Sequence, residues 1–345
     1  MNKIISWLAL IRAKGVGCVK FWKLINEFGD SESAIKYAKV EVDYREAENI
    51  YKKYCNNIII ADNIYYPKRL KILDNRPPIL FYKGDKDILL QDSVGIIGAR
   101  NSSINGNSIA YNMAKNLAPH FSVVSGMARG IDSSVHKGSL TSHKKTVTVL
   151  PLGIENIYPS ENKMLYHEIE SNGVIISEHI DYHGSDPGVF YARNRIVAGM
   201  CKAIVVIEAA NKSGTIQTAN LAIDIGCDVL VVPGSPLDPR SHGGNYLIKN
   251  GAPLVENHFD VLDIIGANYN ISSDKHVVTE SDSFDLRKNH EEKILSLLDT
   301  NPISVEFLAF QSGMPVNEIL QIISILEIRG KIVKHNMNMI SKIKS

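Results

Sequence analysis

Short runs of apolar residues alternate with longer amphipathic stretches through the middle of the chain. Continuous apolar runs are typical of strands that a parallel sheet buries on both faces, and they predict strands at residues 93–97, 120–124, 146–150, 173–176, 202–207 and 228–232. Apolar positions at helical spacing predict helices at residues 107–117, 133–140, 162–171, 190–198, 218–225 and 244–250. Strands separated by helices favour right-handed crossovers. We therefore expect an α/β core with a mainly parallel sheet and helices on both faces.

The N-terminal segment has a helical pattern. A glycine turn from Gly15 to Gly17 joins an apolar helix to an amphipathic helix that carries Phe21 and Trp22. This is the shape of a helix-hairpin-helix, whose turn N–H groups can hold a DNA phosphate. A small helical bundle closed by a glycine turn has the same pattern, and we favour that interpretation. Residues 37–57 are polar and helical in pattern, and the α/β unit is expected to begin near residue 63.

The C-terminal part of the chain forms a separate pattern. Hydrophobic content falls after Gly266, and a stretch rich in Ser, Asp and Asn reads as a linker. Beyond it, apolar periodicity predicts helices near residues 294–298, 305–309 and 316–326 and a short strand at 331–334. Three helices and a β-wing are typical of a winged-helix module. The predicted domains are 1–60 (helical, SAM-like), 61–266 (core), 267–286 (linker) and 287–345 (winged helix).

The charge balance restricts the classes of function. With 38 Lys and Arg against 37 Asp and Glu, the formal net charge is +1, so a polyanion site must be a local patch. The third winged-helix helix carries Glu318 and Glu327 against Arg329, which favours a protein partner or weak nucleic-acid binding. The four cysteines are scattered, which disfavours a zinc site or a disulfide framework and suits the cytoplasm. No signal peptide or membrane span is expected.

Small residues and cations follow several of the predicted strands. Gly98-Ala99-Arg100 follows the strand at 93–97, residues 125–132 follow the next strand, and residues 211–215 follow the strand at 202–207. A glycine turn before a helix N-terminus presents backbone N–H groups to an anion. The carboxyl ends of parallel strands share one edge of the sheet. Together with the cluster Arg193-Asn194-Arg195, these turns predict one site for a ligand that carries several phosphates.

In their order and spacing, these motifs resemble the DNA-processing protein A family (DprA, also called Smf) over nearly the whole chain. Further matching motifs lie at residues 157–162, 176–178, 208–210, 232–235 and 237–241. The resemblance implies an extended Rossmann-like core that binds single-stranded DNA, forms a homodimer and helps to load the RecA recombinase during natural transformation. The chain departs from the family pattern at Pro151, where a glycine is common, and at Tyr191, where a proline often follows the phenylalanine.

Carried over to this chain, the resemblance implies that the strand-end turns and the arginine cluster contact the single strand. The candidate DNA- and phosphate-binding residues are Gly98, Arg100, Ser125, Gly126, Arg129, Gly130, Tyr191, Arg193, Asn194, Arg195, Lys212, Ser213, Gly214 and Thr215. Tyr191 is a candidate stacking platform for a base, whereas Phe190 is at least as well explained by core packing. Asp132, Glu178 and Glu208 are expected to orient arginines or cap helices, and the unclustered histidines predict no metal site.

Other classes of function fit parts of the pattern. Phosphoribohydrolases that cleave nucleoside monophosphates share the Gly-Thr turn, but no carboxylate for acid–base catalysis closely follows Thr215 here. A dinucleotide-dependent oxidoreductase would place Gly-x-Gly-x-x-Gly where Arg100 stands. An adaptor that acts only through its winged helix would leave the clustered arginines without a purpose. We therefore predict a non-enzymatic, cytoplasmic protein that binds single-stranded DNA without cofactor, metal or membrane, with the phosphoribohydrolase as the alternative.

Overall fold

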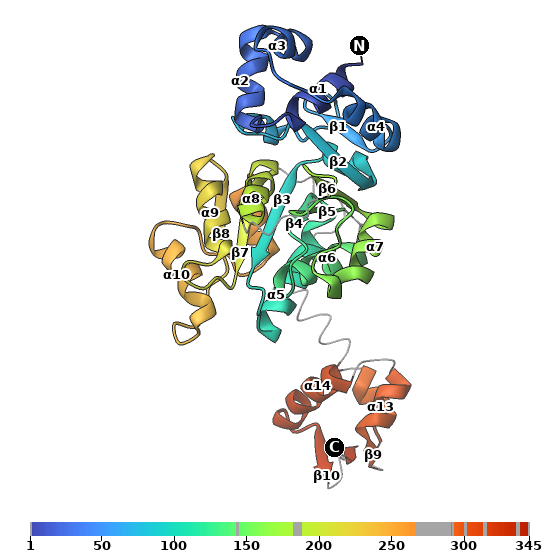
Figure 1. Cartoon of the computed structure of the whole chain (residues 1–345). Coiled ribbons are helices and arrows are strands. Elements are labelled where there is room, and N and C mark those ends of the chain that lie inside the picture. The colour runs from blue at the N-terminus through green and yellow to red at the C-terminus, as the bar shows by residue number, and fades with distance from the viewer. Residues whose placement is uncertain are drawn as a thin grey trace. The chain divides into compact units, whose positions relative to one another are not determined.

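The computed structural model describes residues 2–142, 145–181, 188–266, 291, 293–299, 302–312, 316–335 and 339–343. The chain divides into two compact units, Met1–Ala267 and Asn268–Ser345 (Figure 1). The predicted linker at residues 267–286 lies outside the described residues. Within the described part, no helix has both the length and the apolar character required to cross a bilayer.

Helices build the N-terminal part of the first unit. They are α1 (Lys3–Arg12), α2 (Cys18–Phe28), α3 (Ser31–Tyr37) and α4 (Tyr44–Tyr54). The turn between α1 and α2 requires glycine because Gly15 has a φ of +75°. Trp7, Phe21 and Trp22 pack edge to face, with ring centroids 5.1–5.6 Å apart. The predicted helix–turn–helix is confirmed. The polar stretch at 37–57 is helical over α4 and at Tyr37, the last residue of α3.

A mainly parallel sheet forms the core of the first unit. Its parallel strands are β3 (Ser93–Gly98), β4 (Ser122–Ser125), β5 (Thr146–Val149), β6 (Val174–Ser177), β7 (Cys201–Ile207) and β8 (Asp228–Val231). Each matches a predicted strand, with the bounds shifted by a few residues. Two antiparallel strands that the pattern did not predict, β1 (Ile58–Ile60) and β2 (Ile79–Gly84), extend the sheet beside β6. The sheet therefore begins before residue 63, where the α/β unit was expected to start.

The strand order places a topological switch between β3 and β7. Among the described residues the order is β1-β2-β6-β5-β4-β3-β7-β8. The chain leaves β3 towards β4 through one helix and leaves β7 towards β8 through another, in opposite directions along the sheet. Open α/β sheets bind ligands at the carboxyl ends of the strands where the order reverses in this way. The fold therefore predicts a ligand site at the loops that follow β3 and β7.

Helices cover both faces of the sheet, as predicted. They are α5 (Ile104–Leu117), α6 (Ile131–Thr141), α7 (Lys163–Asn172), α8 (Gly188–Met200), α9 (Gly214–Asp224), α10 (His242–Lys249) and α11 (His258–Ile264). Short 3-10 turns lie at η1 (Arg69–Ile72), η2 (Lys86–Leu90), η3 (Ser160–Asn162) and η4 (Pro239–Ser241). α5 and α7 each pack against α6, and α8 packs against α9 (Figure 1).

The second unit has the predicted winged-helix architecture. Its described elements include β9 (Ile303–Ser304), α13 (Val305–Ser312), α14 (Val316–Ile328), β10 (Ile332–His335) and β11 (Met339–Lys342). β11 pairs antiparallel with both β10 and β9, so the wing is larger than the single predicted strand. Lys334 and Arg329 are ion-paired to Glu327 and Glu291, at 2.6 and 2.5 Å. These pairs reduce the positive charge that this unit offers to a nucleic acid.

Candidate nucleic-acid interface

A cleft of about 540 Å³ opens at the carboxyl ends of β3, β4 and β7, where the strand order reverses. Nine of the residues that the sequence analysis named as candidates line this cleft: Gly98, Arg100, Gly126, Tyr191, Arg193, Asn194, Ser213, Gly214 and Thr215. A smaller hollow of about 30 Å³ shares Arg100, Gly126 and Arg193 with the cleft and reaches Arg129. The turns that the sequence places after separate strands therefore meet in one continuous depression.

The N-terminus of α9 forms one wall of the cleft. Thr215 Oγ1 donates a hydrogen bond of 3.0 Å to the carbonyl of Gly98, at the end of β3. Ser213 caps the helix, because its side chain accepts from the backbone N–H of Ile216. Gly214 has open space where a Cβ would stand. An accessible helix N-terminus of this kind favours a bound phosphate.

Close backbone approach at Gly98 and Gly130 shapes the junction of β3 with α6. A Cβ at Gly98 would stand 2.0 Å from the carbonyl oxygen of Ile207 and 2.6 Å from Ile131 Cγ1. Gly130 has a φ of +76°, and its Cβ would stand 2.4 Å from the carbonyl oxygen of Ala99. Both glycines thus allow close contact between backbone segments, and Gly98 also lines the cleft.

Arg193 forms the floor of the cleft. Its guanidinium is buried, and Nη1 donates to the carbonyl of Gly126, at 2.7 Å, and to that of Val149. Burial lowers the pKa of Arg193 to about 10, partly offset by the carboxylate of Asp132. Burial likewise raises the pKa of Asp132, and Arg193 opposes this shift. Arg193 therefore stays charged at neutral pH and ties the ends of β4 and β5 together.

More accessible cations and aromatic rings lie around this floor. The Arg100 guanidinium stands 5.5 Å from the centre of the Phe190 ring, which also meets Tyr158 edge to face. Tyr191 is 52% exposed and lines the cleft. The Arg129 side chain is 66% exposed and faces Glu161 at 3.5 Å. Cations beside aromatic platforms are the combination that binds single strands without reading sequence.

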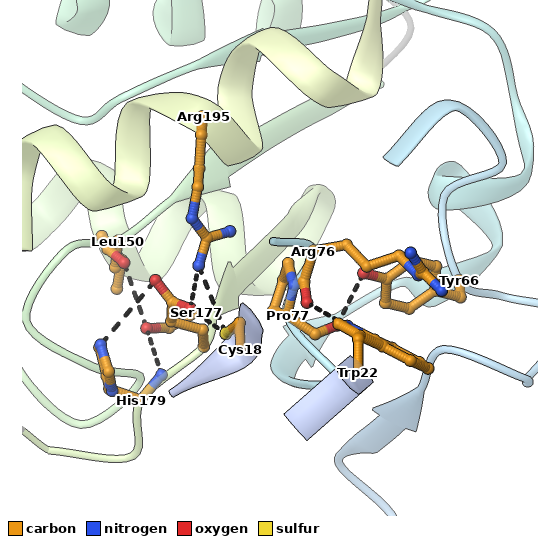
Figure 2. Close-up of polar contacts among 10 residues, drawn as sticks. Cys18, Trp22, Tyr66, Arg76, Pro77, Leu150, Ser177, His179 and Arg195 are labelled. Carbon is orange, nitrogen blue, oxygen red and sulfur yellow. Dashed lines mark hydrogen bonds and ion pairs between the residues drawn. The ribbon is translucent and has the colours of Figure 1, made fainter. Parts of the chain in front are cut away.

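Two predicted contact residues are placed elsewhere by the structure. Ser125 is fully buried, and its Oγ donates to the carbonyl of Ile96 at 2.8 Å, so it braces β4 against β3. Arg195 is absent from the described lining of the cleft and pairs with Glu178 at 2.5 Å instead (Figure 2). Neither side chain belongs to the described lining of the cleft, and contact of either residue with a strand stays a prediction. Lys212, at a φ of +58°, is exposed on the turn before α9 but also lies outside the lining.

The cleft is also lined by residues outside the set of candidate contacts, among them Asp132 and Phe190, for which the sequence favoured other roles. These additional lining residues are Ile97, Ala99, Asn101, Ala128, Asp132, Phe190, Val197, Ala210, Gln217, Thr218 and Arg240. Asn101 and Ala210 belong to the same strand-end turns, so extending each turn by one or two residues would have found them. Gln217 and Val197 lie one turn further along α9 and α8, and only the packing of the helices brings them to the cleft.

The acidic residues behave as expected. Asp132 faces Arg193 and accepts from the backbone N–H of Ala128 at 3.2 Å. Glu178 pairs with Arg195, and Glu208 accepts from the backbone N–H of Ser103, at 2.8 Å, and from its hydroxyl, at the start of α5. Among the described residues that line the cleft, Asp132 is the one with a carboxylate side chain. In the described part of the chain, no three His, Cys, Asp or Glu side chains gather as metal ligands would.

His136 lies behind the site rather than in it. It is fully buried on α6, and its Nδ1 lies 2.7 Å from Thr146 Oγ1. Burial, reinforced by the positive charge of Arg193, lowers the pKa of His136 to about 3. The imidazole is therefore neutral at physiological pH, and its position between α6 and β5 is that of a core residue.

Family profiles match most of the chain. The profile described as DNA recombination-mediator protein A matches residues 57–266, DprA-like N-terminal HHH domain matches residues 2–37, and DprA winged helix domain matches residues 287–336. The DNA processing protein DprA of Streptococcus pneumoniae is 35% identical over 224 residues, covering 64% of this chain and 78% of the relative. Protein Smf of Escherichia coli is 30% identical over 283 residues, covering 80% and 74%.

Two solved structures resemble the fold and share 29% sequence identity with this chain. The X-ray structure of DNA processing protein A from Streptococcus pneumoniae superposes with a TM-score of 0.67 and covers 76% of this chain and 97% of its own. DNA processing protein A from Helicobacter pylori, described for its single-stranded DNA binding mode, has a TM-score of 0.56 and covers 61% and 97%.

Proposed function

The chain belongs to the DNA recombination-mediator protein A family, and on this premise we propose that it binds single-stranded DNA in the cleft at the carboxyl ends of β3, β4 and β7. The observation that carries the proposal is the meeting of Arg100, the open N-terminus of α9 and the exposed ring of Tyr191 in one depression. Cations and helix N–H groups bind phosphates of any sequence, and aromatic faces stack on any base. The binding should therefore be largely independent of sequence.

We further propose that the protein binds this strand without chemical reaction. A phosphoribohydrolase needs a carboxylate beside the Gly-Thr turn, and the cleft residue that follows Thr215 most closely is the amide Gln217. The carboxylate among the described lining residues, Asp132, is buried and faces Arg193. Because the Asp132 carboxylate is enclosed and already accepts from the backbone N–H of Ala128, it is poorly placed to take a proton from a substrate or water. These features favour binding over hydrolysis.

The recombination-mediator family suggests a place for this binding. We propose that the protein acts in the cytoplasm as a homodimer that loads RecA on incoming single strands during natural transformation. Exposed apolar side chains on α9 and α10, Ile223 and Tyr246, are candidates for the dimer surface, at 52% and 60% exposure. Because Arg329 and Lys334 of the winged helix are ion-paired to Glu291 and Glu327, we propose that this unit binds a protein partner rather than DNA.

Fluorescence anisotropy of a labelled oligonucleotide tests the proposal. We expect the full chain to bind a single strand more tightly than the matched duplex. The affinity should fall steeply between low and moderate salt, because each neutralised phosphate of a single strand releases about 0.7 counterions. Equal binding of the duplex, or none of either, would contradict the proposal, and hydrolysis of nucleoside monophosphates would then be assayed.

Substitution of Arg100 tests whether the turn after β3 contacts the strand. Arg100→Ala should weaken binding of every oligonucleotide about tenfold, since it removes one charge-assisted phosphate contact. The slope of log affinity against log salt should fall by about 0.7. Arg45→Ala removes the same charge from an exposed position on α4 and should leave affinity within about twofold. An Arg100 variant with wild-type affinity would exclude this turn from the interface.

A further inference from the structure

Helix α8 carries two arginines that anchor it on different sides. An α-helix turns about 100° per residue, so side chains two positions apart point in nearly opposite directions. Arg193 points to the carbonyls of Gly126 and Val149 under the cleft. Arg195 points to Glu178, which directly follows β6 (Figure 2). Tyr191 and Asn194, which line the cleft, belong to the same helix, so its position decides theirs.

The Arg195 ion pair is almost completely enclosed. The side chains of Arg195 and Glu178 are 12% and 11% exposed, and Nη2 lies 2.5 Å from Oε2. Glu178 stands on a fixed strand end, because the neighbouring Ser177 Oγ donates to the carbonyl of Leu150 and accepts from the backbone N–H of His179, both at 3.1 Å. His179 Nε2, on a more exposed side chain, lies 3.9 Å from the other Glu178 oxygen, Oε1. Removal of either charge would leave the other largely buried without the ion pair that compensates it.

The N-terminal helices complete this enclosure. Cys18, the first residue of α2, donates its thiol hydrogen to Glu178 Oε2 and accepts from Arg195 Nη2, both at 3.7 Å (Figure 2). Burial, with the nearby carboxylate of Glu178, raises the pKa of the Cys18 thiol to about 12, so the thiol stays neutral. A neutral bridging group adds no charge to the pair and joins both of its members to α2.

A second contact holds α2 in this place. Trp22 lies four residues after Cys18 and therefore shares its helical face. Its Nε1 donates to the carbonyl of Arg76 at 2.8 Å, and the Arg76 guanidinium lies 3.8 Å from the centre of its ring. The Tyr66 hydroxyl donates to the carbonyl of Pro77, which fixes the same loop (Figure 2). The first half of α2 is thus attached to the core at two points one helical turn apart.

We propose that the Glu178–Arg195 pair, enclosed by Cys18 of α2, is a positioning element that holds α8 where single-strand binding requires it. The N-terminal helices then influence the affinity of the cleft from a distance. They contribute none of its described lining residues, the first of which is Ile97. The proposal rests on the proposed function, since single-strand affinity is its readout. It assigns to these helices a task within the chain, in place of the phosphate contact that a helix-hairpin-helix turn would make.

Glu178→Gln is the sharpest test, because positioning and simple electrostatics predict opposite signs. Removing a negative charge should tighten the binding of a polyanion. If the pair positions α8, the isosteric amide should instead weaken single-strand binding about tenfold. The salt slope should stay unchanged, because no phosphate contact is lost. Glu168→Gln, which removes the same charge from an exposed position on α7, is the matched control and should bind like the wild type.

Cys18→Ala provides a second measurement from the N-terminal side, with about threefold weaker binding expected and again no change of salt slope. Thermal midpoints of all variants establish whether each is folded at the assay temperature. If Glu178→Gln is unfolded there, the single-strand affinity of Cys18→Ala tests the positioning role instead. Wild-type affinity or tighter binding in the folded variants would overturn the positioning role while leaving the proposed function intact. Absence of single-strand binding by the wild type would overturn both.

Discussion

Replacing Arg193 with Ala is expected to lower the free energy of unfolding by about 3–5 kcal/mol and to abolish single-strand binding. Arg193 is only 7% exposed, and its guanidinium donates to the carbonyls of Gly126 and Val149. Its removal takes a charged donor away from these carbonyls and leaves the buried carboxylate of Asp132 with neutral donors such as the backbone N–H of Ala128. Burying such uncompensated groups is costly. Urea denaturation followed by circular dichroism, with anisotropy on the same samples, measures both effects.

Two further variants make the Arg193 result specific. Arg129→Ala makes the same substitution at a side chain that is 66% exposed, with a weak 3.5 Å contact to Glu161. Its stability should change by less than about 1 kcal/mol. Adding Asp132→Asn to Arg193→Ala should recover part of the loss, because it removes the unpaired buried charge. A stability of Arg193→Ala within about 1 kcal/mol of the wild type would show that the guanidinium does not hold the strand ends.

Gly98→Ala is expected to destabilise the protein by about 3 kcal/mol or more, near the upper end of overpacking effects. The added Cβ would stand 2.0 Å from the backbone oxygen of Ile207, and two atoms of the Ile131 side chain lie within 2.9 Å. Since the nearest obstacle is backbone of the adjacent strand β7, relief requires the two strands to move apart. The same movement would break the bond from Thr215 to the Gly98 carbonyl and displace α9.

Gly214→Ala serves as the matched control for this prediction. It makes the same substitution in the same cleft, yet nothing lies within 4 Å of its Cβ. Because Gly214 is the first residue of α9 and Ala favours a helix, its stability should equal or exceed the wild type by up to about 1 kcal/mol. Thermal or urea denaturation of both variants decides the matter. Equal stability of the two would mean that β3 and β7 tolerate a wider separation than their contact suggests.

The parallel strands were predictable because burial on both faces leaves a local mark. Residues 202–207 are almost continuously apolar, as a strand between two layers of helices must be. The same logic failed for β1 and β2 at the edge of the sheet. β1 has only three residues, and β2 directly follows Pro77 and Pro78. Because consecutive prolines are typical of a loop, they outweighed the short apolar run that would have predicted a strand. Their antiparallel pairing depends on contacts across the chain rather than on local pattern.

Turn chemistry at the strand ends was also local, and it located the cleft. Gly98, Arg100, Gly126 and Thr215 could be assigned to one edge of the sheet because parallel strands end on the same side. The roles of the arginines were not local. Arg193 and Arg195 stand two residues apart in one motif, and only the packing of α8 sends one to the cleft floor and the other to Glu178.

By itself, the sequence determined the succession of strands and helices, the flanking helical modules and the edge at which a polyanion could bind. These features depend on hydrophobic periodicity and on glycine turns, which act within a few residues of the chain. Tertiary structure alone decided that Ser125 is a buried brace and that Cys18 meets Glu178 and Arg195. Residues 160 positions apart come together through packing of whole elements, and one sequence carries no local signal of which faces will meet.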